Sequence, residues 1–324
     1  MVGWWGRSLI LTRLNPPPPL HKATVAMAAL TTTDLHGALP LIAKGKVRDI
    51  YELPDNSSLL FVATDRISAY DVVMSNGIKD KGKLLTALSA FWFELLGDKC
   101  PNHLISTTDF PAEVKQYEDQ LVGRSMVVKK HKIFPVEAIV RGYITGSAWA
   151  EYKKEGTVHG IKVPEGMKES QMFEKPLFTP STKAEQGEHD ENIHPDKVVE
   201  LVGEKYAKRI EELALELYTT ARDYAAERGI IIADTKFEFG LNEKDEIVLV
   251  DEVLTPDSSR FWLASAYEVG KGQDSYDKQF LRDWLTANGV KGKEGVEMPE
   301  DIAKKTGEKY IEAYELLTGR KWNP

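Results

Sequence analysis

The chain has 324 residues, of which 42% are hydrophobic and 28% are charged, and its formal net charge at pH 7 is -8. This length and composition predict a globular protein, either one domain with two lobes or two domains. The negative net charge argues against nucleic-acid binding, and the single cysteine, Cys100, excludes a disulfide framework and a cysteine zinc site and fits a reducing compartment.

The first 26 residues differ in composition from the rest of the chain. They contain no acidic residue and include the run Pro16 to Pro19. A mitochondrial presequence is also poor in acidic residues, but consecutive prolines would break its helix. We therefore expect residues 1–30 to be a disordered extension, or an over-extended reading frame with the working start at Met27. No apolar run approaches the roughly 18 residues of a membrane span, so we expect a cytoplasmic protein without a membrane partner.

The segment from Leu41 to Tyr51 predicts two strands joined by a basic turn. Gly45 lets the backbone approach a phosphate group closely, and Lys46 and Arg48 can neutralise it. A solvated basic turn is the alternative interpretation. A buried strand follows at 59–64, and the loop at its end carries Asp71, in a position where site residues are common.

One motif resembles a phosphate-binding loop without meeting its requirements. Residues Gly77 to Lys83 have the spacing G-x-x-x-x-G-K, but Leu84 stands where that motif needs Ser or Thr to bind Mg²⁺. We interpret this segment as a loop before an amphipathic helix over Lys83 to Lys99.

A second dense segment runs from Ser125 to Ser147. An apolar strand and a basic crossing lead to a strand over Val136 to Val140, which ends at Arg141 before a turn with Gly146 and Ser147. A guanidinium beside a Gly-Ser turn favours a phosphate site. The alternative is that Arg141 satisfies backbone carbonyls in a bend.

The polar stretch from Phe178 to Asn192 predicts a long loop, and long loops in compact domains tend to be functional or disordered. Lys183 and Asp190 are its best site candidates, because the spacing of His189 and His194 is wrong for a helical zinc pair. Helical periodicity predicts three covering helical regions, at Pro195 to Arg228, Asp274 to Asn288 and Glu300 to Thr318.

The stretch from Ile230 to Arg260 predicts a hairpin that holds a metal ion and a phosphate. Alternation places Asp234, Lys236 and Glu238 on one face of its first strand. A register that pairs Glu238 with Asp251 leaves a four-residue loop at 243–246. Carboxylates held beside apolar residues need a counter-charge or an ion, and Mg²⁺ takes one or two protein carboxylates. A solvated face of paired charges is the alternative.

The hairpin is followed by a turn-forming cluster, Thr255 to Arg260, which ends in a guanidinium suited to phosphate. Asp257 lies in this turn. The sequence thus predicts a metal-binding site and an anion-binding site in one stretch, at the hairpin and at the turn that follows it.

Six blocks of this sequence, in this order, resemble the SAICAR synthetase family in its fungal form. They are KGKVRDIYE (44–52), ATDRISAYD (63–71), IFPVEAIVRGYITGS (133–147), FTPSTKAEQGEHDENI (178–193), IIADTKFEFG (231–240) and VDEVLTPDSSRFW (250–262). The resemblance implies an α/β fold of the α+β two-lobe kind, with antiparallel sheets and covering helices, related to ATP-grasp proteins and kinases. It also implies a smaller ATP-covering lobe at 31–130, a larger lobe with the metal and substrate site at 131–324, and a monomer.

The family's reaction is an ATP-dependent ligation in purine biosynthesis. It joins L-aspartate to 5-amino-1-(5-phosphoribosyl)imidazole-4-carboxylate through an acyl phosphate, with Mg²⁺ as cofactor and ADP and phosphate as further products. The alternatives are a kinase-like phosphotransferase, for which no H-R-D-type loop is present, and another ATP-dependent carboxylate-amine ligase on the same fold.

The resemblance assigns roles to individual residues. By similarity, the catalytic residues are Lys236, Glu238 and Asp251, and Glu238 and Asp251 hold the metal. ATP is bound by Lys46, Val47, Arg48, Val128, Lys129, Lys130, Lys183 and Lys236, and the other substrates by Asp71, Arg141, Ser147, Asp190, Asp257 and Arg260.

Overall fold

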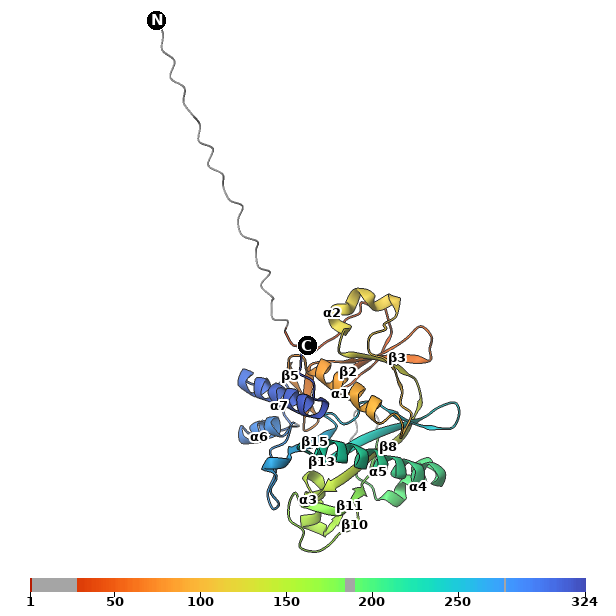
Figure 1. Ribbon diagram of the computed structural model, residues 1–324, viewed down its shortest axis with the longest axis vertical. Helices are drawn as coiled ribbons and strands as arrows, with labels where there is room; N and C mark the ends of the chain where they lie inside the picture. Colours follow the sequence, from red (N-terminus) through yellow and green to blue (C-terminus); the bar gives the residue numbers. More distant parts are fainter. Residues whose placement is uncertain (2–27, 184–189, 277) are drawn as a thin grey trace.

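The computed structural model describes residue 1 and residues 28–183, 190–276 and 278–324. Almost all of the predicted N-terminal extension, and His189, lie outside these residues. The described chain is an α+β fold with two main antiparallel sheets and helices packed on them (Figure 1).

The N-terminal part of the chain builds a five-stranded sheet in the order β1-β2-β3-β7-β6. Its central strand, β3, is buried over most of its length because it carries the apolar run predicted at this place. Helix α1 (Lys81–Leu95) packs against β3 and β7, as its apolar stripe requires. The strands are β1 (Leu41–Lys44), β2 (Arg48–Glu52), β3 (Ser58–Ala63), β6 (Leu104–Ser106) and β7 (Ser125–Lys129).

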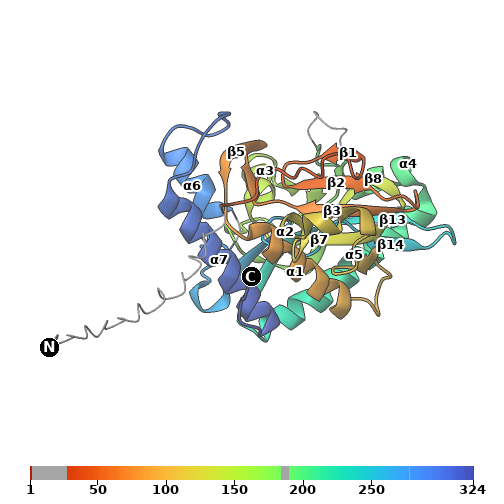
Figure 2. The same ribbon diagram turned by 90° about the horizontal axis from the view of Figure 1, so that it is seen from above.

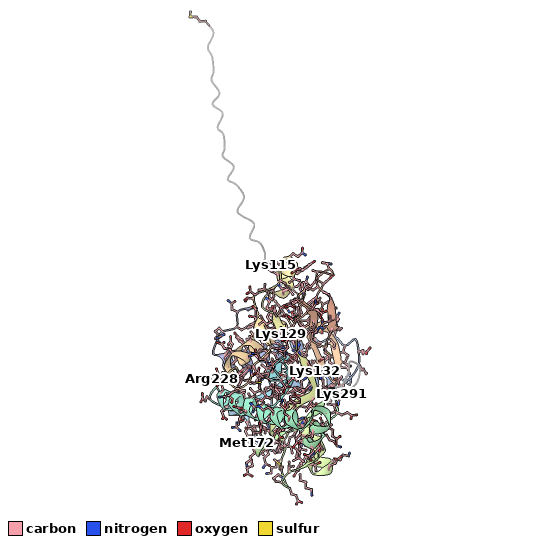
Figure 3. The ribbon with its side chains drawn as sticks, turned by 90° about the vertical axis from the view of Figure 1, so that its right-hand side faces the viewer. Lys115, Lys129, Lys132, Met172, Arg228 and Lys291 are labelled. Atoms are coloured by element: carbon pink, nitrogen blue, oxygen red, sulfur yellow. The ribbon has the colours of Figure 1, made fainter. Side chains whose placement is uncertain are left out.

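The second sheet is six-stranded and antiparallel, in the order β11-β8-β13-β14, with β12 beside β8 and β15 beside β13. Its two longest strands, β8 (Lys132–Tyr143) and β13 (Ile230–Leu241), pair along most of their length. Figure 3 labels Lys129 and Lys132, which flank the crossing from one sheet to the other. The other strands are β11 (Met172–Phe178), β12 (Ser181–Thr182), β14 (Ile247–Val250) and β15 (Ser259–Leu263).

Helices α1, α4, α5, α6 and α7 lie where apolar periodicity predicts them, whereas α2 and α3 were not predicted, and the predicted turn at Gly146 and Ser147 is wrong because these residues begin α3. The α5 helix packs on β8 and β13, and α7 packs on α1 and α6; Figure 2 shows α6 and α7 at one end of the molecule and α4 at the other. No helix in the described ranges is both long and apolar enough to cross a membrane. The bounds are α2 (Glu118–Leu121), α3 (Gly146–Glu155), α4 (Val198–Val202), α5 (Glu204–Ala226), α6 (Gln279–Ala287) and α7 (Glu300–Thr318).

The described residues also contain two small two-stranded ribbons. Strands β4 (Arg66–Ala69) and β5 (Val72–Gly77) form a two-stranded ribbon whose turn contains Asp71. Strands β9 (Thr157–Val158) and β10 (Ile161–Lys162) form a second ribbon after α3.

One hydrophobic cluster joins the two sheets. Phe61 of β3 and Trp92 of α1 belong to it, together with Leu217 of α5 and Phe237 of β13. The surface between the sheets is therefore packed, and strand ends near it are held rigidly.

The predicted hairpin register is wrong by one residue. Glu238 lies opposite Val250 rather than Asp251, and the connection is five residues long, from Asn242 to Glu246. Asn242 closes the longer turn because its side-chain oxygen accepts from the backbone N–H groups of Lys244 and Glu246, each at 2.9 Å. Asp251 lies beyond the strand, with a φ of 64°.

Candidate active site

The centre of the site is the face of β13 that carries Asp234, Lys236 and Glu238. Strand β8 runs antiparallel beside it, and its register places Arg141 opposite Asp234 and Glu137 opposite Glu238. Because residues opposite each other in an antiparallel pair share a face, four charged side chains are brought together around Lys236. The predicted alternation is confirmed. The alternative, a solvated face of paired charges, is wrong, since Asp234 and Glu238 are only 5% exposed.

Lys236 is held between two carboxylates. Its Nζ lies 2.6 Å from an oxygen of Glu137 and 2.8 Å from an oxygen of Glu238. Ser181 Oγ donates to the second oxygen of Glu137 at 3.0 Å, and Lys183 pairs with Glu238. We call Glu137, Lys236 and Glu238, with Asp251, the carboxylate cluster.

Burial and ion pairing act in opposite directions on this cluster. Burial alone would raise the pKa of Glu238, but the ammonium groups of Lys236 and Lys183 outweigh it and lower the pKa to about 2. Burial would lower the pKa of Lys236, and Glu238 and Glu137 raise it instead. Lys236 and Glu238 are therefore both charged at neutral pH.

Asp251 reaches the cluster from the end of β14. Its left-handed backbone turns the chain so that its carboxylate meets Arg48 of β2 at 2.6 Å, and Arg48 also lies 3.2 Å from Glu252. Burial, with the nearby charges of Glu238 and Glu252, raises the pKa of Asp251 despite Arg48. The pKa of Arg48 is raised because Asp251 and Glu252 outweigh its burial.

A second group of charges lies two residues back along β13. A single oxygen of Asp234 accepts from Arg141 at 3.1 Å and from Arg260 at 2.5 Å, and Arg141 also donates to Ser147 Oγ at 3.3 Å. We call these four residues the arginine cluster. Two guanidinium groups share one carboxylate, so the cluster carries an excess of positive charge.

The arginine cluster opens into two adjoining cavities of about 490 and 550 Å³, both lined by Arg260 and Gly146. The first is also lined by Asp71, Lys278 and Arg282. Three cations thus line one polar cavity, which suits an anionic ligand.

Asp257 lies behind the wall of this cavity. Its carboxylate is 2% exposed and pairs with the ammonium groups of Lys81 at 2.7 Å and Lys278 at 3.2 Å, while Tyr310 donates to it at 2.7 Å. Burial would raise the pKa of Asp257, but Lys278 and Lys81 lower it. This arrangement fixes Lys278 at the cavity wall.

The remaining predicted residues lie around these clusters. Lys46, in the turn before β2, pairs with Asp71 at the rim, and the carbonyl of Val47 accepts from Thr64. Val128 is completely buried in the core, and Lys130 pairs with Glu52 at the surface. Asp190 is exposed, in the loop that follows residues 184–189, which lie outside the described part of the chain.

Sequence reasoning missed three residues that the fold brings to the site. The sequence did indicate Glu137, because it is an acidic residue inside the otherwise apolar strand predicted at 136–140. Lys278 and Arg282 had none, because both lie at the start of α6 and resemble the polar face of an amphipathic helix.

The side chains of the carboxylate cluster match the ligand types that Mg²⁺ prefers. Among the described residues no three acidic, histidine or cysteine side chains converge into a ready metal cage. Mg²⁺ does not need one, because it binds through one or two carboxylates and completes its shell with water and phosphate oxygens. Glu238 and Asp251 provide the oxygen ligands that this ion prefers.

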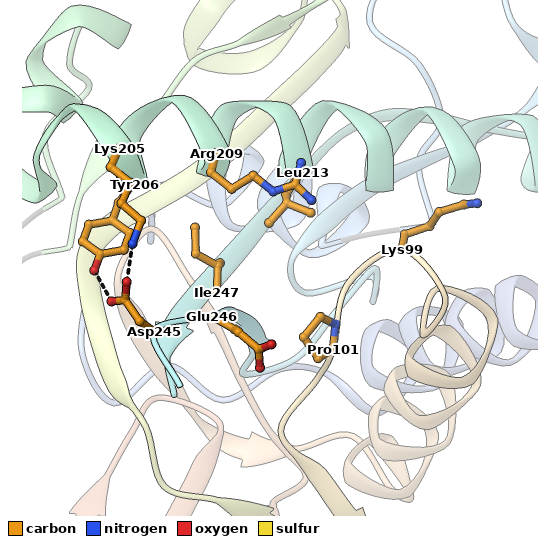
Figure 4. A pocket seen from close by; sticks show the side chains of 9 residues that line it. All are labelled: Lys99, Pro101, Lys205, Tyr206, Arg209, Leu213, Asp245, Glu246 and Ile247. Atoms are coloured by element: carbon orange, nitrogen blue, oxygen red, sulfur yellow. Dashed lines mark hydrogen bonds and ion pairs between the residues drawn. The ribbon is translucent and has the colours of Figure 1, made fainter. Parts of the chain in front are cut away.

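A further pocket, of about 310 Å³, lies between α5 and the tip of the β13–β14 hairpin (Figure 4). Three of its polar side chains pair with each other, since Lys205 and Tyr206 both bond to Asp245. It shares no lining residue with the two clusters.

A cationic cavity beside a buried lysine–carboxylate cluster, on an antiparallel sheet with a second sheet over it, is the site of an enzyme that acts on phosphate-bearing substrates. The comparisons with known proteins place the chain within this class. A family model described as SAICAR synthetase matches residues 41–299. The chain belongs to the SAICAR synthetase family.

Relatives and solved structures agree with this assignment. The phosphoribosylaminoimidazole-succinocarboxamide synthase of Pichia angusta is 64% identical over 301 residues, which cover 90% of this chain and 99% of that protein. The same enzyme from Saccharomyces cerevisiae is 62% identical over 305 residues, covering 91% of this chain and 99% of that protein.

Two solved structures extend the comparison to the fold. The Saccharomyces cerevisiae SAICAR synthase in complex with SAICAR matches with a TM-score of 0.86 and 60% identity, over 91% of this chain and 100% of that chain. A SAICAR synthetase in complex with ADP matches with a TM-score of 0.65 and 26% identity, over 87% of this chain and 99% of that chain. The predicted fold class and ATP-dependent ligation in purine biosynthesis are confirmed, and a kinase-like phosphotransferase is not favoured.

Proposed function

We propose that the two clusters on β13 divide the ligation between them. The carboxylate cluster handles the phosphates of ATP, and the arginine cluster holds the phosphate of the imidazole substrate. The observation that carries this proposal is the contrast in charge: Lys236 has two carboxylate partners, whereas Asp234 has two guanidinium partners.

A carboxylate does not form an amide readily at neutral pH, because oxide is a poor leaving group. Transfer of the γ-phosphoryl group of ATP to the substrate carboxylate creates a good leaving group, and the amine of L-aspartate then attacks the acyl carbon and releases phosphate. Such a transfer depends on positioning and on neutralising charge. The ammonium group of Lys236, fixed by Glu137 and Glu238, is suited to stabilising the transferring group.

Mg²⁺ is part of the same proposal, with Glu238 and Asp251 as the residues that hold it. When bound, the ion neutralises phosphate charge and orients the phosphates. Lys183 and Arg48, which pair with these carboxylates, would contact phosphate oxygens, and we assign the same role to Lys46 and the backbone at Val47.

The assignments at the edges of the site also remain proposals. Arg141, Ser147 and Arg260 bind the ribosyl phosphate, with Asp71 and Asp190 as further substrate contacts. Asp257 acts through Lys278. Val128, Lys129 and Lys130 border the adenine. The two lobes at 31–130 and 131–324 are supported by the ranges of the two sheets. We also propose a cytoplasmic monomer.

The experiment that tests the proposal is a coupled assay of ADP release with Mg-ATP and the imidazole carboxylate, run with and without L-aspartate. Amide formation that needs aspartate in the wild type and is lost in Glu238→Ala supports it. Glu200→Ala, an exposed residue of α4 that pairs with Lys197, is the control and should match the wild type. ADP release indifferent to aspartate, without amide product, would contradict the proposed reaction.

A further inference from the structure

Arg66, the first residue of β4, has no role in the site described above. It is 7% exposed, and its guanidinium donates to the carbonyl of Thr31 at 2.8 Å and to a carboxylate oxygen of Asp49 at 2.7 Å. The other carboxylate oxygen of Asp49 accepts from the hydroxyl of Thr33 at 2.6 Å. Because Asp49 is buried and fixed in this way, it sets the orientation of the guanidinium plane.

The guanidinium of Arg66 also holds the basic turn that precedes β2. Its Nη2 donates to the carbonyl of Gly45 at 2.9 Å, and its Nε donates to the carbonyl of Lys46 at 3.3 Å. The next carbonyl, that of Val47, accepts from the N–H of Thr64 at 2.9 Å and from the Thr64 hydroxyl at 2.8 Å. Successive carbonyl groups of the turn are therefore all bonded to the segment 64–66.

These bonds decide which way the N–H groups of the turn face. A trans peptide unit is planar, and its C=O and N–H point in opposite directions. The carbonyl of Gly45 shares a peptide unit with the N–H of Lys46, and the carbonyl of Lys46 shares one with the N–H of Val47. Because Arg66 draws both carbonyls to one side, both N–H groups face the other side. Within the described part of the chain, neither N–H group donates a hydrogen bond.

Two neighbouring N–H groups that face the same way can bind an anion. Positive side chains lie close to them, because Lys46 carries its ammonium in the same turn and Arg48 begins β2 directly after it. Arg48 lies 2.6 Å from Asp251, so the turn is next to the carboxylate cluster. Backbone donors and cations gathered at one place suit a phosphate group.

We propose that Arg66 is a positioning residue for ATP. Together with Thr64, it holds the carbonyl groups of the turn on one side, and this leaves the N–H groups of Lys46 and Val47 for a phosphate group of the nucleotide. The inference rests on the proposed function, which places the phosphates of ATP at this turn. Arg66 itself touches no substrate.

The main test is Arg66→Lys, which keeps a positive charge beside Asp49 but lacks the planar fork of donors that reaches the carbonyls. Arg124→Lys is the matched control. Arg124 is also a buried arginine, at 5% exposed, and it donates to Asp65 at 2.7 Å and to the carbonyl of Ala63 at 3.2 Å. These partners lie outside the turn, so this control reproduces the loss of a buried guanidinium without releasing the turn.

The measurements are the KM for ATP, the KM for the imidazole carboxylate and the melting temperature. We expect Arg66→Lys to raise the KM for ATP about tenfold, as the loss of a hydrogen bond to the backbone predicts. The KM for the imidazole carboxylate should not change. Arg124→Lys should lower the melting temperature and leave both KM values unchanged. A purely structural arginine at position 66 would give the same result as this control.

A second variant, Thr64→Val, removes only the hydroxyl that donates to Val47 and nearly keeps the shape of the side chain. Because the N–H of Thr64 still holds that carbonyl, the KM for ATP should rise only about threefold. If Arg66→Lys does not fold, this variant decides: a raised KM for ATP with an unchanged KM for the imidazole carboxylate supports the inference, and two unchanged values overturn it.

Lys46→Ala separates the inference from the proposed function on which it rests. If Lys46→Ala raises the KM for ATP while Arg66→Lys leaves it at the wild-type value, the turn binds phosphate but Arg66 does not position it, and the inference is overturned. If neither variant changes the KM for ATP, the phosphates of ATP do not bind at this turn, and the proposed placement of the nucleotide is wrong as well.

Discussion

The arginine cluster and the carboxylate cluster are centred on residues only two positions apart on one strand, yet they carry opposite excess charges. At Asp234, one carboxylate is shared by two guanidinium groups. At Lys236, one ammonium is shared by two carboxylates. Strand β13 supplies the central charge of each cluster and also Glu238, while Glu137, Arg141 and Arg260 come from the neighbouring strands β8 and β15.

The register of β8 against β13 creates this difference. Because Arg141 and Glu137 are four residues apart, as are Asp234 and Glu238, both opposite pairs fall on the same face. A shift of one residue would move the side chains of β8 to the other face and dissolve both clusters. The sign of each cluster therefore depends on the charges that β8 and β15 place beside β13, as well as on the charges of β13 itself.

The variant Glu238→Gln should have the largest effect on the carboxylate cluster, because it keeps the shape of the side chain and removes its charge. Lys236 and Lys183 lose their shared partner and the proposed metal loses a ligand, so kcat should fall about 10³-fold, as for removal of a key electrostatic group. Steady-state kinetics of ADP release measure this. If instead only the KM for the imidazole carboxylate rose, the division of roles between the clusters would be wrong.

Arg260→Lys tests the other cluster, because it keeps the charge and removes the fork of N–H donors. The KM for the imidazole carboxylate should rise about 10- to 100-fold, the value of a lost hydrogen bond between charged groups. The KM for ATP should not change. Arg228→Lys, at the end of α5 over the ring of Tyr224, is the control. Equal increases in both KM values would show that the clusters are not separate.

Glu137→Gln refines the description of the carboxylate cluster. Lys236 keeps Glu238 as a partner, so kcat should fall only about tenfold, the value of one hydrogen bond to a charged group. Glu174→Gln, an exposed residue of β11, serves as the control. A loss as large as that of Glu238→Gln would make Glu137 an equal member of the metal site rather than a support for Lys236.

The smallest expected effect is on stability in acid. The pKa of Glu238 is lowered from 4.5 to about 2 in the folded protein, so its contribution to stability is complete above pH 4.5 and is lost as the pH falls toward 2. That contribution is at most about 3 kcal/mol, at 1.36 kcal/mol for each unit of pKa. Urea unfolding of the wild type and Glu238→Gln, compared from pH 5 to 2.5, should show the two free energies of unfolding converging. Curves that stay parallel would mean that Glu238 has an ordinary pKa.

Much of the fold could be predicted because it depends on local patterns. The predicted helix at Glu300 to Thr318 has the observed bounds, since its apolar stripe and the glycine that follows it are local signals. The hairpin register was missed by one residue, because the extra turn residue is fixed by the side chain of Asn242 rather than by strand periodicity. The N-terminal extension lies outside the described residues and stays a prediction.

The sequence by itself determined the family, the alternation of Asp234, Lys236 and Glu238, and the basic and glycine-bearing segments that supply Lys46, Arg48 and Arg141. Periodicity and motif spacing are properties of neighbouring residues, so a sequence displays them directly. Only the tertiary structure decided that Glu137 faces Lys236 and that Lys278 reaches the cavity through Asp257. Glu137 and Lys236 are 99 positions apart in the chain, and such partners are chosen by strand register and packing, which no local pattern encodes.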